Sequence, residues 1–197
     1  MTAGAEMRNE LTDTVERLPV IGAARSEEGL HAVLESEVGV VFLLYGDICN
    51  IGRIVKTAKA AHKLVLVHAD LINGLASKEI AADFIHQFTE ADGIITTKSP
   101  LIRRAKELGL YTVQRFFVID SMACENISRQ LAACRPDMIE VLPGVMPEVI
   151  RALARTCRVP IIAGGLIQKK EDVVSLLGAG AAAVSASSET IWSLLGE

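Results

Sequence analysis

The sequence predicts an α/β fold, a compact (β/α)8 TIM-like barrel with short loops. Eight apolar segments of strand length alternate with eight segments of helical periodicity along the chain. Several of the strand segments are continuous runs of Val, Ile and Leu, which is typical of parallel strands covered on both faces. An open doubly wound sheet shares this alternation. The barrel is favoured because no glycine-rich dinucleotide loop follows the first strand and because eight strands close a barrel.

The predicted elements alternate in order. The strands are residues 19–23, 39–44, 64–69, 93–97, 111–119, 138–142, 159–163 and 182–186. The helices lie near residues 26–36, 50–62, 79–90, 99–108, 123–134, 147–156, 171–177 and 189–195. Ser26 before two glutamates is an N-cap signal, and Pro100 and Pro147 occupy first-turn positions. Gly109 and Gly178 stand where helices end.

Length limits what this barrel can carry. The chain has 197 residues, of which 1–17 are polar and acidic and are expected to form an N-terminal extension. Residues 18–197 then form a single barrel domain with about 22 residues per unit, which one strand, one helix and two short connections use up. Only the segments 70–78 and 120–125 leave room for modest loops. We therefore expect no large lid over the strand ends.

Composition excludes several classes of protein. The longest apolar run, residues 38–44, is too short for a membrane span. Four scattered cysteines without a CxxC pair indicate reduced thiols in a cytoplasmic protein. The net charge of −4, from 20 basic and 24 acidic residues, does not favour nucleic acid as the default partner.

Polar side chains at the carboxyl ends of the strands are the candidates for function, because active and binding sites of barrels lie there. His68 and Asp70 are two residues apart and share a face. They could bind hydroxyl groups, or a metal ion if a third ligand joined, and the alternative is that Asp70 only caps a helix or loop. Asp47 and Lys98 follow the second and fourth strands.

Two charges lie inside apolar strands, Arg115 on the fifth and Glu140 on the sixth. A buried charge without a partner is costly, so the simplest prediction is an Arg115–Glu140 pair between neighbouring strands. From sequence, a structural pair and a ligand-binding pair look the same.

The last two units carry small residues that suit an anion. Gly164 and Gly165 end the seventh strand, and Ser185 and Ser187 end the eighth. Glycine allows close approach of backbone N–H groups, and the loops after strands 7 and 8 are the usual phosphate site of this architecture. A phosphate site is predicted here, with tight turns and an N-cap as the alternative.

Neither a metal centre nor a catalytic set is indicated. Of the four histidines only His68 falls on a strand, so no His-rich metal site is expected. P-loop, nucleophile-elbow and zinc-protease motifs are absent from the sequence. Basic residues do recur on three predicted helices, which is usual for the solvated face of outer helices. They are Arg53, Lys56, Lys59 and Lys63, then Arg103, Arg104 and Lys106, then Arg151, Arg155 and Arg158.

Five strings together resemble the glycerol-uptake operon antiterminator regulatory proteins. These strings begin at Val67, Thr96, Gln114, Glu140 and Ile162, reading VHADLINGL, TTKS, QRFFVIDS, EVLPG and IAGGLI. The resemblance runs in the family's order from about residue 18 to the end of the chain.

The resemblance implies a cytoplasmic barrel that senses glycerol 3-phosphate as an effector, needs no cofactor, and is not an enzyme. In the liganded state it would bind leader mRNA and prevent termination of glycerol-catabolic transcripts, alone or as a homodimer. The implied ligand residues are Asp47, His68, Asp70, Lys98, Arg115 and Glu140. Those implied for phosphate are Gly164, Gly165, Ser185 and Ser187.

Two other functions remain open at this stage. One is a phosphate-binding barrel enzyme acting on a small phosphorylated sugar or polyol. The other is a ligand-binding module that acts only through a protein partner.

Overall fold

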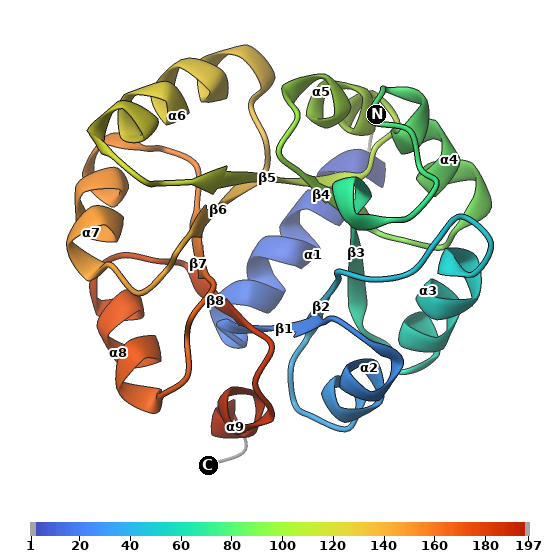
Figure 1. Ribbon diagram of the computed structural model, residues 1–197, viewed down its shortest axis with the longest axis horizontal. Helices are drawn as coiled ribbons and strands as arrows, with labels where there is room; N and C mark the ends of the chain where they lie inside the picture. Colours follow the sequence, from blue (N-terminus) through green and yellow to red (C-terminus); the bar gives the residue numbers. More distant parts are fainter. Residues whose placement is uncertain (1–2, 196–197) are drawn as a thin grey trace.

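The computed structural model describes residues 3–195, without the side chains of residues 3–9, 121, 125, 128 and 195. It confirms the predicted barrel. All eight strands are parallel and follow one another in chain order around a closed barrel, with β8 paired to β1. Figure 1 shows the strands as an inner ring with α2 to α8 arranged around it.

The observed elements agree closely with the expected ones. The strands are β1 Val20–Ala24, β2 Val40–Leu43, β3 Leu64–His68, β4 Gly93–Thr96, β5 Tyr111–Phe117, β6 Met138–Leu142, β7 Ile161–Gly164 and β8 Ala183–Ala186. The helices are α1 Ala3–Arg17, α2 Glu27–Leu34, α3 Ile51–Ala60, α4 Ile80–Phe88, α5 Ser99–Glu107, α6 Ser121–Cys134, α7 Pro147–Thr156, α8 Lys170–Gly178 and α9 Glu189–Trp192. Short 3-10 turns, η1 Ala69–Leu71 and η2 Ser193–Leu195, complete the list.

The strands separate two apolar cores, because alternate side chains point to opposite faces. The inner core fills the barrel and includes Ile21, Phe42 and Leu66, all fully buried. The outer core lies between strands and helices and includes Val41 and Val65, which alternate with the inner residues on the same strands. The barrel is therefore a packed body, and only the ends of the strands are open to a ligand.

Helix α1 is a feature that the sequence analysis missed. It lies across the amino-terminal end of the barrel (Figure 1), and its Leu11 and Val15 are 2% and 0% exposed within the inner core. A Cβ at Gly39, just before β2, would lie 2.5 Å from Thr14 Cγ2, so the helix packs closely on the strand starts. The polar, acidic composition of residues 1–17 concealed these two apolar contacts. With this end closed, the carboxyl ends of the strands form the accessible side, which we call the mouth.

The two expected loops have different outcomes. The connection between β3 and α4 is a long loop, as predicted, and it contains the short turn η1 before α4 begins at Ile80. The segment 120–125 was wrongly expected to be a loop, because α6 already begins at Ser121 and its N-cap, Asp120, accepts a hydrogen bond from the N–H of Ala123 at 2.8 Å. In the described part of the chain no helix is long and apolar enough to cross a membrane.

If α1 is part of the barrel core, Leu11→Ala should lower the free energy of unfolding by about 3 kcal/mol, because it leaves a cavity in the inner core. Urea denaturation measures this loss. Glu16→Ala, on the exposed side of the same helix, is the control and should change stability by less than about 0.5 kcal/mol. Equal stability of the Leu11 variant and the wild type would show that the barrel does not depend on α1.

Candidate functional site

A buried ion pair forms the floor of the mouth. Arg115 on β5 and Glu140 on β6 are direct neighbours in the strand register, and Arg115 Nε donates to Glu140 Oε2 at 2.5 Å. Their side chains are 9% and 2% exposed. Ser185 on β8 donates its hydroxyl to the other carboxylate oxygen, Oε1, at 2.6 Å. The predicted pair is confirmed, and both oxygens of the buried carboxylate are satisfied, as burial requires.

Gly164 on β7 makes room for this network. A Cβ at this position would lie 2.5 Å from Ser185 Oγ and 2.6 Å from Glu140 Oε1. The network thus crosses from β6 over β7 to β8, and only glycine fits beneath it. Gly165 follows with φ +80°, and Leu166 with φ +62°. These two residues turn the chain sharply out of the barrel, and at Leu166 a left-handed backbone is uncommon for a residue with a side chain.

Arg115 keeps donors for a ligand. A guanidinium group has five N–H donors, and within the described residues only Nε of Arg115 makes a hydrogen bond. Its remaining four N–H groups can therefore bind an anion without breaking the pair with Glu140. Fork-like guanidinium donors match phosphate and carboxylate oxygens.

Asp70 is the centre of a second polar group at the ends of β3 and β4. Its Oδ1 accepts from Thr96 Oγ1 at 2.9 Å and lies 3.4 Å from Lys98 Nζ. Its Oδ2 accepts from the N–H and the hydroxyl of Thr97, at 2.8 and 2.9 Å. Burial raises the pKa of Asp70, but these hydrogen bonds and the nearby His68 outweigh it and hold the pKa below its usual value.

Thr96 and Thr97 hold Asp70 in place, and the sequence analysis did not select them as site residues. Their adjacent hydroxyls at the end of a buried strand were the available signal. Through Asp70 they tie the loop after β3 to the loop after β4, so the carboxylate acts here as a loop clamp and also places Lys98. The side chain of Lys98 is 35% exposed and remains accessible from the mouth.

His68, the last residue of β3, is influenced by a charged residue of each of these two polar groups, Arg115 and Asp70. Its side chain is 2% exposed, and neither ring nitrogen has a hydrogen-bond partner within the described residues. Burial lowers its pKa to about 4, with a smaller contribution from the charge of Arg115, while Asp70 opposes the shift. His68 is therefore a neutral imidazole at pH 7.

Three other predicted site residues are placed differently. Asp47 accepts hydrogen bonds from the N–H groups of Cys49 and Asn50 and from Asn50 Nδ2, so its carboxylate is used within its own loop. No described contact joins it to Arg115 or Asp70. Ser185 is buried and committed to Glu140, while Ser187 is exposed at the start of the turn into α9.

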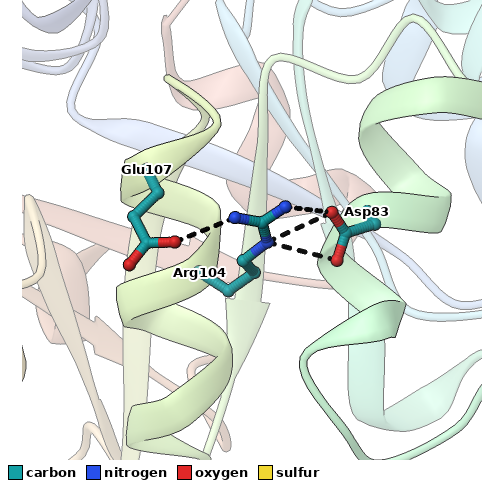
Figure 2. A network of polar contacts seen from close by, with 3 residues as sticks. All are labelled: Asp83, Arg104 and Glu107. Atoms are coloured by element: carbon teal, nitrogen blue, oxygen red, sulfur yellow. Dashed lines mark hydrogen bonds and ion pairs between the residues drawn. The ribbon is translucent and has the colours of Figure 1, made fainter.

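Half of the basic residues named on the outer helices form ion pairs within the described residues. Figure 2 shows Arg104 of α5 held between Asp83 of α4 and Glu107, with Nη1 2.9 Å from Glu107 Oε2 and Nη2 2.5 Å from Asp83 Oδ1. The other ion pairs of this kind are Arg53–Glu27, Lys59–Asp92, Lys106–Asp137 and Arg151–Glu148. Ion pairs on an exposed helix surface of this kind are expected for solvated helix faces.

A cavity of about 360 Å³ lies outside the mouth, between α2 and α9. Its lining includes Glu35, Glu37 and Glu189 together with Trp192. Three carboxylates make it unsuitable for a phosphate group, so the mouth is the better candidate site although its side chains are densely packed.

The chain is similar to known proteins both in sequence and in structure. The family model described as "Glycerol-3-phosphate responsive antiterminator" matches residues 20–192. A relative from Escherichia coli (strain K12), the uncharacterized protein YgcP, is 40% identical over 176 residues, which is 89% of this chain and 92% of YgcP.

Two crystal structures are also similar. The glycerol uptake operon antiterminator regulatory protein from Listeria monocytogenes str. 4b F2365 has 36% identity and a TM-score of 0.84, covering 88% of this chain and 94% of that one. A glycerol uptake operon antiterminator-related protein from Thermotoga maritima MSB8 has 35% identity and a TM-score of 0.79, covering 89% and 98%.

The neutral state of His68 predicts an acid-sensitive stability. Between pH 7 and pH 5 the unfolded chain binds more protons at this residue than the folded one, because the folded pKa is about 4 against an ordinary value of 6.5. Stability should therefore fall over this window, by about 2 kcal/mol at pH 5. Asp70, with its lowered pKa, contributes to acid sensitivity only below its ordinary value of 3.8.

Urea denaturation of the wild type and His68→Leu at pH 7 and pH 5 measures this contribution. The variant should lose less stability than the wild type on acidification. Equal losses in the two proteins would mean that His68 is not held neutral by the fold.

Proposed function

The chain belongs to the glycerol-3-phosphate responsive antiterminator family, and we propose that it binds glycerol 3-phosphate at the mouth and, when liganded, binds leader mRNA. In this role it prevents transcription termination in glycerol-catabolic operons and acts in the cytoplasm. The family match over residues 20–192 carries the proposal.

The chemistry of the mouth supports a phosphorylated polyol as the effector. Arg115 has donors without a partner among the described residues, and Lys98 is accessible, so two cations are available for a phosphate group. The backbone turn at Gly165 and the exposed hydroxyl of Ser187 lie at the ends of β7 and β8, where this architecture usually binds phosphate. Because the hydroxyl of Ser185 is donated to Glu140, we assign Ser185 and Gly164 a supporting role beneath the phosphate.

The protonation states of the mouth favour a sensor over an enzyme. A general acid or base works best with a pKa near the operating pH. The pKa values of His68 and Asp70 are both shifted downward, away from neutrality, and both oxygens of Glu140 are occupied. Neither His68 nor Asp70 is therefore poised to exchange a proton with a substrate at pH 7.

The charge distribution bears on how RNA could bind. The protein carries a net charge of −4, and many cations on the outer helices are ion-paired. We therefore propose that RNA contacts use a local surface, formed in the liganded state or by two copies of the chain. A ligand can promote RNA binding only if it favours the RNA-competent state, so RNA must in turn strengthen ligand binding.

Titration of leader RNA with and without saturating glycerol 3-phosphate tests the function. The ligand should tighten RNA binding by about tenfold or more, a coupling of typical size. Binding should also weaken linearly in a plot of log affinity against log salt, because RNA phosphate contacts release counterions. Glycerol and inorganic phosphate are the control ligands and should each have much smaller effects.

Equal RNA affinity in the presence and absence of glycerol 3-phosphate would contradict the regulatory role. Tight ligand binding without any RNA association would instead indicate a module that acts through a protein partner. Conversion of the ligand to a product, abolished by Asp70→Asn, would indicate the enzyme alternative.

A further inference from the structure

Within the described residues, His68 is the buried side chain with the most polar atoms left without a partner, since Tyr45 and Tyr111 each lack one for a single hydroxyl. Both of its ring nitrogens lack partners within the described residues, although the side chain is 2% exposed. By contrast, Gln114 on β5 is fully buried, and both the nitrogen and the oxygen of its side-chain amide have hydrogen-bond partners. Its Nε2 donates to Ser99 and Gln130, each at 3.0 Å, and its Oε1 accepts from Cys134 Sγ at 2.9 Å.

Stability does not explain an imidazole at this position. A buried donor or acceptor without a partner costs free energy, whereas an apolar side chain of similar size would not. The neighbouring interior residues of β3 are leucines, Leu64 and Leu66, and both pack in the inner core. Polar groups retained at a cost in stability are typical of binding sites.

We propose that His68 recognises a hydroxyl group of the effector and thereby selects a phosphorylated polyol over a phosphate ester that lacks the hydroxyl. This inference rests on the proposed function, since it assumes that a phosphorylated polyol binds at the mouth. The phosphate end would be bound by Arg115 and Lys98, which lie on the neighbouring strands β5 and β4 or directly after them.

The chemistry of a neutral imidazole matches a hydroxyl group. One ring nitrogen donates and the other accepts, and a hydroxyl can likewise do both. A phosphate dianion only accepts, so it would be better served by the cations. With its pKa lowered to about 4, His68 keeps this donor–acceptor character at neutral pH.

Burial of His68 links recognition to a change in the mouth. Because both nitrogens are covered, a hydroxyl can reach them only if neighbouring side chains shift. Asp70 and Arg115 are the charged groups whose electrostatic influence reaches His68. Hydroxyl binding would therefore favour a different arrangement of the two polar groups of the mouth, which an effector-responsive protein requires.

Calorimetric titration with glycerol 3-phosphate and with n-propyl phosphate tests this assignment. The second compound keeps the phosphate and the three carbons but lacks both hydroxyls. His68→Leu should weaken binding of glycerol 3-phosphate by about 10- to 100-fold, because the hydroxyl loses its partner. It should change the dissociation constant of n-propyl phosphate by less than about threefold and leave Tm at pH 7 unchanged or raised.

Gln114→Leu is the matched control, since it also replaces a buried polar residue by leucine but on the outer face of β5. It should lower Tm, because satisfied hydrogen bonds are lost, and leave the preference between the two ligands unchanged. His68→Gln retains a donor and an acceptor and should keep part of the preference. In the wild type, nitrogen NMR of labelled histidines should show that glycerol 3-phosphate shifts the imidazole signals of His68 and that n-propyl phosphate does not.

The outcomes separate this inference from the proposed function. If the wild type binds glycerol 3-phosphate but His68→Leu affects both ligands equally or neither, the hydroxyl assignment is wrong and the function stands. The same holds if the NMR signals of His68 do not respond. If the wild type does not bind glycerol 3-phosphate at all, the proposed function fails and the assignment falls with it.

Discussion

The buried pair of Arg115 and Glu140 is the constraint on which the rest of the mouth depends. Two charges inside a barrel are tolerated only if each is hydrogen-bonded, and the parallel register of β5 and β6 places them directly opposite each other. The second oxygen of Glu140 then requires a donor, which Ser185 supplies from two strands away. The residue of β7 that lies between the two side chains has no room for a Cβ, which accounts for Gly164. The buried carboxylate of Glu140 thus constrains residues on three other strands, β5, β7 and β8, while the outer N–H groups of Arg115 have no partner within the described residues.

The mouth combines groups that stabilise it with groups that are left to bind. Asp70 is saturated by Thr96, Thr97 and Lys98, and it clamps the loops after β3 and β4. Within the described residues, the ring nitrogens of His68 and the outer nitrogens of Arg115 have no hydrogen-bond partner, and they belong to the same end of the barrel. In such a site the hydrogen bonds of Asp70 hold the surrounding loops in place, while His68 and Arg115 keep donors and acceptors without a partner among the described residues. That arrangement suits a protein that must respond to a small polar ligand and does not need to transform it.

Much of this architecture could be predicted from sequence, since the alternation of elements and the charges within apolar strands are local signals. The Arg115–Glu140 pair could be predicted because each of two adjacent apolar strands carries one charged residue. Three features could not be predicted in the same way. One depends on strands brought together by closure of the barrel, one on two apolar residues within a polar segment, and one on local contacts within a loop. Ser185 is 45 positions from its partner Glu140, and the described side chains of helix α1 contribute Leu11 and Val15 to the core from a polar segment. The carboxylate of Asp47 is used by its own loop, which its position at a strand end did not reveal.

The most direct test of the account is a crystal structure of the protein with glycerol 3-phosphate bound. The phosphate should lie at the mouth, within hydrogen-bond distance of the guanidinium group of Arg115 and close to the turn at Gly165. A hydroxyl of the ligand should lie within hydrogen-bond distance of a ring nitrogen of His68. A ligand seated instead between α2 and α9, with the side chains of the mouth unchanged, would contradict the account.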